Sequence, residues 1–235
     1  MSLFLRVTAT CSKCGKEAET ELAASVNADR RDDLRSAIID GSFQALDCSG
    51  CGTAVRLPAH LTYIDVDRGQ WILVEATDRL EQWYAVEDEA AALYDTAFGA
   101  SAPPVQRQMG EDIHGRLVFG WTALREKLIA AEAGLDDGIL ELLKMGVLRN
   151  VPAPPLSDRT ELRLVDIEED GGLRLRWVNG LTEEGIADLP VDREIYDALA
   201  AGLGPWEALL ADVRSGLFVD LNRLLIVRPV RDMAA

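Results

Sequence analysis

The sequence places all four of its cysteines in two copies of the motif C-x-x-C-G, at residues 11–15 and 48–52. A two-residue spacer lets the backbone curl, so that both sulfurs of a pair point at one position about 2.3 Å away, the zinc–sulfur distance. The glycine after each pair suits the tight turn of such a knuckle, where a positive φ is favoured. The repeat predicts a structural four-thiolate zinc site, with no open position for a substrate, whose metal ligands are Cys11, Cys14, Cys48 and Cys51.

Other uses of paired cysteines fit this pattern less well. A redox C-x-x-C normally occurs once, at the start of a helix that lowers the pKa of one thiol. Structural disulfides belong to oxidising compartments, and iron–sulfur clusters commonly use tighter, grouped spacings. Zinc is favoured, and Lys13 and Lys16 beside the first pair are expected to offset the negative charge of four thiolates around a dication.

The 33 residues between the two pairs are longer than the connection of a minimal zinc ribbon and predict folded structure. Residues 18–28 alternate enough to form a strand that returns from the first knuckle. Residues 29–47 predict a short helix whose apolar face carries Leu34, Ile38 and Ile39, with Asp29 as a candidate cap and Gly41 as a candidate stop. The sequence therefore predicts a zinc ribbon with a helical insertion over about residues 5–68.

Residues 69–150 predict an extension of mixed strands and helices. Strands joined by a tight turn at the "DRG" of residues 67–69 are followed by a helix over 78–99, a short buried strand over 115–120, and two helices separated at Gly134. Thr122 is a candidate cap for the first of these helices. Asp136 and Asp137 are adjacent and point in different directions on a helix, so capping explains them better than acid–base chemistry.

A proline-rich segment, residues 151–158, predicts a linker to a separate small domain over residues 159–235. A hairpin is expected there, because leucines and Trp177 alternate with charged residues on both sides of an Asp-Gly-Gly turn. Two short helices follow, and residues 217–230 predict a closing strand. The predicted fold class is α+β.

Composition narrows the function classes. The chain has 24 Lys and Arg against 40 Asp and Glu, a formal net charge of −16, which disfavours binding to a nucleic acid backbone. No apolar run reaches the roughly 18 residues that a transmembrane helix needs, and the first residues lack the basic start of a secretory signal. We therefore expect a cytoplasmic protein without membrane contact.

The sequence predicts no catalytic residues and no site for an organic cofactor. His60 and His114 lie on expected loops without a neighbour that suggests a catalytic group, and neither is expected to bind the metal. The glycine pairs at 171–172 and at 202 and 204 do not match either type of phosphate-binding loop, so both are interpreted as turns.

The two knuckles, the segment "LTYIDVDRGQWILVE" and above all "RLVFGWTALREKLIAAEAGLDDGILELLKMGVL" resemble the CpXC protein family, bacterial proteins named for two cysteine knuckles. The similarity covers about residues 5–150. It implies that Cys11, Cys14, Cys48 and Cys51 correspond to the four cysteines of the family and that this region binds zinc. Ser12 and Ser49 stand where the family name records a proline, at spacer positions that do not bind the metal.

The hypothesis that follows is a non-enzymatic adaptor or regulator, in which zinc holds the ribbon rigid and the ribbon or the acidic carboxy-terminal unit presents a surface to an unknown protein partner. A ribbon that binds nucleic acid through Lys16, Arg30, Arg31, Arg35 and Arg56 is the alternative, although acidic residues interleave with these side chains. An enzyme with a site in a cleft between the units is a third possibility, and a deep pocket with converging polar groups would favour it.

Overall fold

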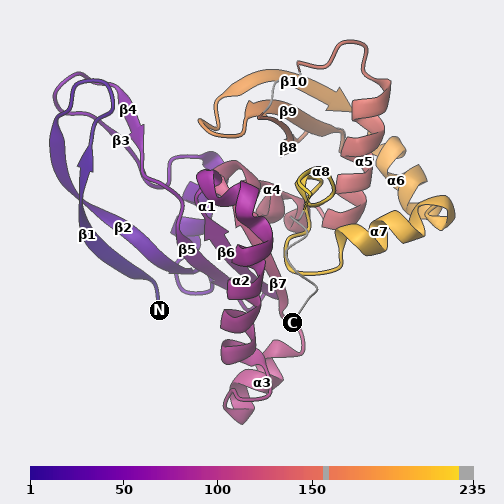
Figure 1. The fold of residues 1–235 in the computed structure, drawn as a ribbon, viewed down its shortest axis with the longest axis horizontal. Coiled ribbons are helices and arrows are strands. Elements are labelled where there is room, and N and C mark those ends of the chain that lie inside the picture. The colour runs from indigo at the N-terminus through magenta and orange to yellow at the C-terminus, as the bar shows by residue number, and fades with distance from the viewer. Residues whose placement is uncertain (156–158, 228–235) are drawn as a thin grey trace, which may run out of the picture.

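The computed structural model describes residues 1–155 and 159–227. Helices and strands are interspersed along the chain, which confirms the mixed α+β class (Figure 1). The strands are β1 (Leu3–Thr10), β2 (Glu17–Asn27), β3 (Ala45–Asp47), β4 (Ala54–Arg56), β5 (Leu61–Asp65), β6 (Gln70–Glu75), β7 (His114–Phe119), β8 (Thr160–Ile167), β9 (Leu173–Asn179) and β10 (Gly185–Val191). The helices are α1 (Asp32–Asp40), α2 (Trp83–Phe98), α3 (Pro104–Gly110), α4 (Gly120–Glu132), α5 (Asp137–Asn150), α6 (Arg193–Ala201), α7 (Glu207–Val213) and α8 (Asn222–Leu225), with 3₁₀ turns η1 (Thr77–Gln82) and η2 (Gly204–Trp206).

A five-stranded mixed sheet, in the order β1-β2-β5-β6-β7, forms the centre of the amino-terminal part. Its β1–β2 and β5–β6 pairs are antiparallel, whereas β2–β5 and β6–β7 are parallel. Apolar side chains of α1 and α4 pack on one face of the sheet, and those of α2 pack on the other. Strand β6 is therefore buried on both faces, which explains the continuous apolar run "WILV" at its centre.

The first cysteine hairpin is part of this sheet rather than a separate module. Strands β1 and β2 extend away from the helices, and the short hairpin β3–β4 lies beside their far end (Figure 1). The predicted insertion between the cysteine pairs is present as β2, α1 and β3. Gly41 ends α1 with φ 84°, and Leu34 and Ile38 are buried, as the periodicity predicts.

The carboxy-terminal part is a three-stranded antiparallel sheet, β10-β9-β8, covered by α5, α6 and α7. The predicted hairpin is confirmed as β8 and β9, in which Leu162 faces Trp177 and Leu164 faces Leu175. Strand β10 was not predicted. The predicted closing strand over 217–230 is wrong for its described residues, 217–227, which form loop and helix α8; residues 228–230 lie outside the described residues.

Helix α4 lies between the two sheets and joins them. One side of α4 packs on the five-stranded sheet, while Ile129 and Ala130 near its end belong to the same apolar cluster as Leu164 of β8. That cluster also contains α5, so it takes residues from both sides of segment 151–158. The division into two units at this segment remains a prediction, and the packing gives the two units one shared core.

Two predicted helix caps are wrong. Asp29 does not cap α1; its carboxylate accepts hydrogen bonds from the backbone N–H groups of Val66 and Asp67 and so fixes the β5–β6 turn. Thr122 does not cap α4 with its side chain; instead its backbone N–H donates to the carboxylate of Glu183, 2.6 Å away. Asp29 is therefore bonded to a remote turn rather than to α1, whose amino terminus has no side-chain cap, and a remote carboxylate accepts from the first turn of α4.

Candidate metal centre

Each cysteine pair lies in a tight knuckle at the end of a hairpin. In the first knuckle the N–H of Gly15 donates to the carbonyl of Cys11, and in the second the N–H of Gly52 donates to the carbonyl of Cys48. The two glycines have φ 71° and φ 68°, the left-handed conformation that the motif predicts. The two knuckles therefore have the same backbone form, although 33 residues separate the pairs.

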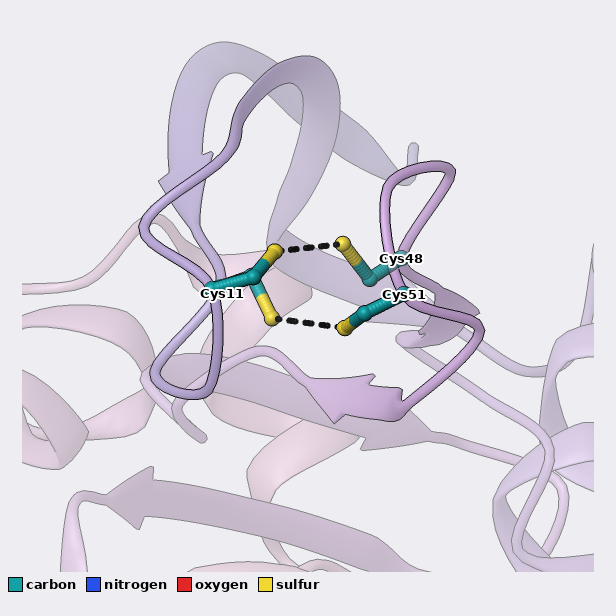
Figure 2. A group of neighbouring side chains, drawn as sticks. Cys11, Cys48 and Cys51 are labelled. Carbon is teal, nitrogen blue, oxygen red and sulfur yellow. Dashed lines mark hydrogen bonds between the residues drawn. The ribbon is translucent and has the colours of Figure 1, made fainter.

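The tertiary structure brings the four sulfurs together. The two knuckles face each other with their sulfurs directed into the space between them (Figure 2). The Sγ atoms of Cys11 and Cys51 are 3.8 Å apart, those of Cys14 and Cys48 are 3.5 Å apart, and all four lie within 4.8 Å of one another. A tetrahedron of sulfurs at about 2.3 Å from a central ion has S···S edges of about 3.8 Å, so these residues fit a four-coordinate metal ion.

Local hydrogen bonds favour thiolates in the second knuckle. The backbone N–H groups of Gly50 and Cys51 lower the pKa of Cys48 to about 6. The Thr53 hydroxyl and backbone lower the pKa of Cys51. The backbone N–H of Lys16 favours the thiolate of Cys14, but hydrogen bonds with the other thiols raise its pKa to about 12.

Four thiols at these distances lose their protons together only when a cation balances the charge. The donor set, the burial of Cys11 and Cys48, and the distances together make the cluster suited to binding zinc.

Side chains of the first knuckle cover the second. A Cβ on Gly50 would lie 2.8 Å from the Cδ of Lys16 and 3.4 Å from the sulfur of Cys14. Lys16 therefore crosses from one knuckle to the other, in a position consistent with the expected offset of thiolate charge. Lys13 is exposed on the first knuckle.

The other candidates from the sequence lie elsewhere. His60 is largely exposed and its Nδ1 is 3.0 Å from the carboxylate of Glu75. Asp136 caps α5, as predicted, by accepting a hydrogen bond from the N–H of Ile139. Asp137 does more than favour the helix terminus, because Arg116 and Lys127 both contact its carboxylate. These two cations outweigh the effect of burial and lower the pKa of Asp137 well below its usual range.

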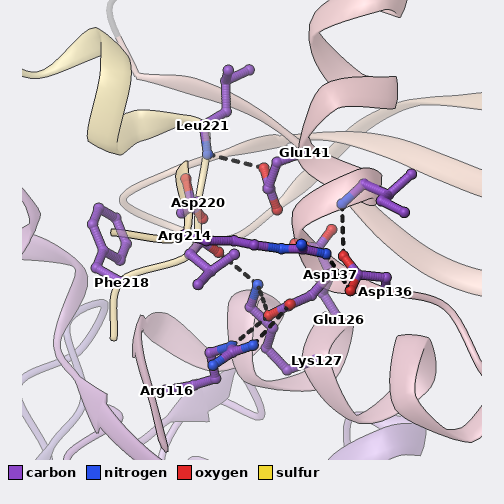
Figure 3. A network of polar contacts seen from close by, with 12 residues as sticks. Arg116, Glu126, Lys127, Asp136, Asp137, Glu141, Arg214, Phe218, Asp220 and Leu221 are labelled. Atoms are coloured by element: carbon purple, nitrogen blue, oxygen red, sulfur yellow. Dashed lines mark hydrogen bonds and ion pairs between the residues drawn. The ribbon is translucent and has the colours of Figure 1, made fainter. Parts of the chain in front are cut away.

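A second polar cluster, which no sequence motif predicts, is buried between α4, α5 and β8. We call it the ionic network, and its members, each at most 4% exposed, are Glu126, Glu141, Lys144, Arg163 and Asp220. Lys144 Nζ lies 2.6 Å from Glu126 Oε1 and 2.8 Å from Glu141 Oε1. Arg163 Nη1 lies 3.1 Å from Glu126 Oε1 and 2.5 Å from Asp220 Oδ2. Figure 3 shows Glu126, Glu141 and Asp220 where α4, α5 and the segment before α8 meet.

One signal in the sequence could have indicated this network. Helices α4 and α5 carry apolar residues on nearly every face, so their charged residues have little solvent to face. The position of Arg163 does not indicate the network, because the alternation of apolar and charged residues along its strand predicts a solvated side chain. Arg163 is buried because Glu126 of α4 and Asp220 lie against it, and the carboxylate of Glu126 also accepts a hydrogen bond from the N–H of Leu164.

Among the described residues, no helix combines the length and the apolar character that crossing a bilayer demands. No curated protein and no solved structure matches the chain at significant similarity. The resemblance to CpXC proteins, expected over about residues 5–150, is confirmed by a family model, described as CpXC protein, that matches residues 9–144. Since this match covers more than half of the chain and contains both knuckles, the chain belongs to the CpXC protein family.

Proposed function

We propose that Cys11, Cys14, Cys48 and Cys51 hold one structural zinc ion and that the zinc-braced ribbon presents a surface for a partner protein. The observation that carries this proposal is the convergence of four thiols from two remote hairpins within 4.8 Å. Zinc accepts four sulfur ligands in a tetrahedron and, once so bound, has no position left for a substrate. The proposed role of the ion is therefore structural, and for the protein we propose the non-enzymatic role of an adaptor or regulator.

The region that the ion would brace has a thin apolar core. Strand β1 contains only exposed and half-buried residues, and full burial on β2 begins only at Ala23, where the sheet meets the helices. Strands β3 and β4 have no fully buried residue. A structural zinc ion contributes on the order of 10 kcal/mol to the folding of small modules, which is enough to order such a hairpin pair.

The edge of the five-stranded sheet is the surface that we propose for the partner. Strand β1 forms this edge in the described structure, and Leu3 and Leu5 on it are 51% and 49% exposed. An exposed edge with apolar side chains accepts an added strand from another chain, which supplies main-chain hydrogen bonds and side-chain contacts. We infer a protein partner that adds an extended segment to β1.

The nucleic-acid alternative has weaker support. Arg31 pairs with Asp33, and Arg35 is buried beside Asp65 with Glu132 as a further partner. Arg56 stacks over the ring of Trp121. These side chains are engaged within the protein, and the net charge of −16 repels a phosphate backbone.

The metal proposal is tested on the full chain by elemental analysis together with thermal unfolding before and after chelation. We expect about one zinc ion per chain and a melting transition that falls on chelation and recovers when zinc is restored. Cys48→Ser should abolish metal retention, whereas Ser49→Ala, a change at the neighbouring spacer position, should retain it. A chain that carries no zinc, or whose melting is unchanged by complete zinc removal, contradicts the proposal.

The partner proposal needs a separate experiment. A photo-crosslinking residue at position 5 should trap a defined protein in cells, and the same residue at the exposed position 225, outside the sheet, should not trap it. Crosslinking should disappear in the Cys48→Ser background, since the ribbon loses its brace. Equal trapping at both positions would rule out β1 as the contact surface.

A further inference from the structure

A cleft of about 280 Å³ lies where the β5–β6 turn, the start of β7 and the α4–α5 junction meet. Three cations and a histidine line it in a protein whose net charge is strongly negative. Its charged and amide-bearing lining residues are Arg68, Gln70, His114, Arg116, Lys127, Asp136 and Asp137. No residue of the four-cysteine cluster takes part in it.

The two carboxylates in the cleft are already engaged by the protein. Asp137 accepts from Arg116 Nε at 2.7 Å and from Arg116 Nη2 at 3.1 Å, and Lys127 Nζ lies 2.9 Å away (Figure 3). Asp136 pairs with Arg214 and accepts from the N–H of Ile139. One carboxylate between two cations leaves an excess positive charge on that side of the cleft.

The cations keep donor capacity toward the cleft. A guanidinium has five N–H donors, and Arg116 uses three of them, on Asp137 and the carbonyl of Gly115. Arg68 is 43% exposed and contacts the buried carboxylate of Asp65, which Arg35 also approaches. Helix α5, with 14 residues, directs the positive end of its dipole toward the same space.

Gln70 brings an amide to the cleft. The residue is half-buried and lines the cleft, and its Oε1 atom makes no hydrogen bond within the described residues. Because an amide oxygen only accepts hydrogen bonds, it can pair with a hydroxyl group of a ligand but not with a carboxylate.

We propose that the cleft binds a small organic anion whose carboxylate or phosphate group pairs with Arg68 and Arg116 and which carries a hydroxyl group for the amide of Gln70. The volume is at the lower end for small-molecule sites, which run from about 300 to 1,000 Å³, so the ligand has the size of a central metabolite rather than of a nucleotide. The inference does not depend on the zinc proposal, because none of these residues touches the cysteines.

Calorimetric titration of the full chain with inorganic phosphate and, separately, with succinate tests the cleft. We expect saturable binding of at least one of these probes in the millimolar range or tighter. Arg68→Gln should weaken binding about tenfold, as expected for the loss of one charge-assisted contact. The matched control is Arg176→Gln, which removes an arginine paired with Asp188 away from the cleft and should leave binding unchanged.

Gln70→Leu separates a ligand contact from a structural role. The variant removes the amide while nearly keeping the side-chain volume, so the melting temperature should stay constant or rise. Binding of phosphate, whose P–OH group can donate to the amide oxygen, should weaken, whereas binding of succinate, which has no donor, should not. If phosphate binds more tightly than succinate, the anionic group of the ligand is a phosphoryl group. If succinate binds more tightly, it is a carboxylate. The proposal is overturned if neither anion binds at about 10 mM, a level that detects even weak sites, or if Arg68→Gln binds like Arg176→Gln.

Discussion

The four-cysteine cluster and the ionic network both join distant parts of the chain, but one lies at the surface and the other in the interior. Both bring groups from distant parts of the chain to one point, and both demand that opposite charges meet. The cysteines do so at the exposed tips of two hairpins, where two of the four side chains remain exposed. The network does so in the interior, where its members are at most 4% exposed.

The difference lies in what balances the charge. The thiols need an ion from solution, so their stabilisation depends on conditions outside the chain. The network contains its own cations, Lys144 and Arg163, against three carboxylates. Burying such ions costs several kcal/mol each, and their attraction repays this cost only while every partner is present. The stability that the network provides therefore depends more on the presence of each member than on the composition of the solution.

The largest effect that we expect from one substitution is at Lys144. Lys144→Met leaves Glu126 and Glu141 without their shared cation and should lower the free energy of unfolding by about 3–5 kcal/mol. Denaturant unfolding measures this change. Lys13→Met, at an exposed position on the first knuckle, should stay within about 0.5 kcal/mol of the parent. If the two variants lose the same stability, the contrast between the regions fails.

A smaller effect is expected from acid. Burial would raise the pKa of Asp220, but Arg163 and Lys144 overcome it and lower that pKa from 3.8 to about 2. A lowered folded-state pKa stabilises the protein above pH 3.8, and this stabilisation is lost as the pH falls toward 2.

The test is a comparison of slopes. Between pH 4 and pH 2, the free energy of unfolding should fall further for the parent than for Asp220→Asn. The difference in the total decrease over this range should be on the order of 1–2 kcal/mol. Parallel curves for the two proteins would show that Asp220 is not ionised in the folded network. Asp33, an exposed partner of Arg31, supplies the control Asp33→Asn, whose slope should stay close to that of the parent.

The smallest effect is expected in the knuckles themselves. Gly15 has φ 71°, and a Cβ there would meet no atom within 4 Å, so Gly15→Ala should cost only the backbone strain of about 1–2 kcal/mol. Gly146 in α5 has equally open surroundings but a helical backbone, and Gly146→Ala should stabilise by up to about 1 kcal/mol. Thermal unfolding of the zinc-loaded variants shows whether each variant is less or more stable than the parent. If both substitutions changed the stability in the same direction, the role assigned to Gly15 would be contradicted.

Sequence reasoning was most successful where neighbours along the chain decide the structure. The knuckle turns, the end of α1 at Gly41, the capping of α5 by Asp136 and the β8–β9 hairpin all depend on residues within a few positions of one another. It failed at Asp29 and Thr122, because backbone groups and a carboxylate from remote segments compete for the same hydrogen bonds. Strand β10 was missed, and its burial pattern is mostly exposed, so it carries little apolar periodicity to read.

The sequence by itself determined which four residues form the candidate metal centre, because C-x-x-C-G specifies its own turn and its own donors within five positions. Only the tertiary structure decided which charged residues are buried and which face a cleft. Whether Arg163 meets water or Glu126 depends on the placement of α4 beside β8, and the packing around Gln70 leaves its Oε1 atom without a hydrogen bond within the described residues. These outcomes depend on the desolvation and pairing of groups that are far apart along the chain. A local sequence pattern does not show which distant groups will meet.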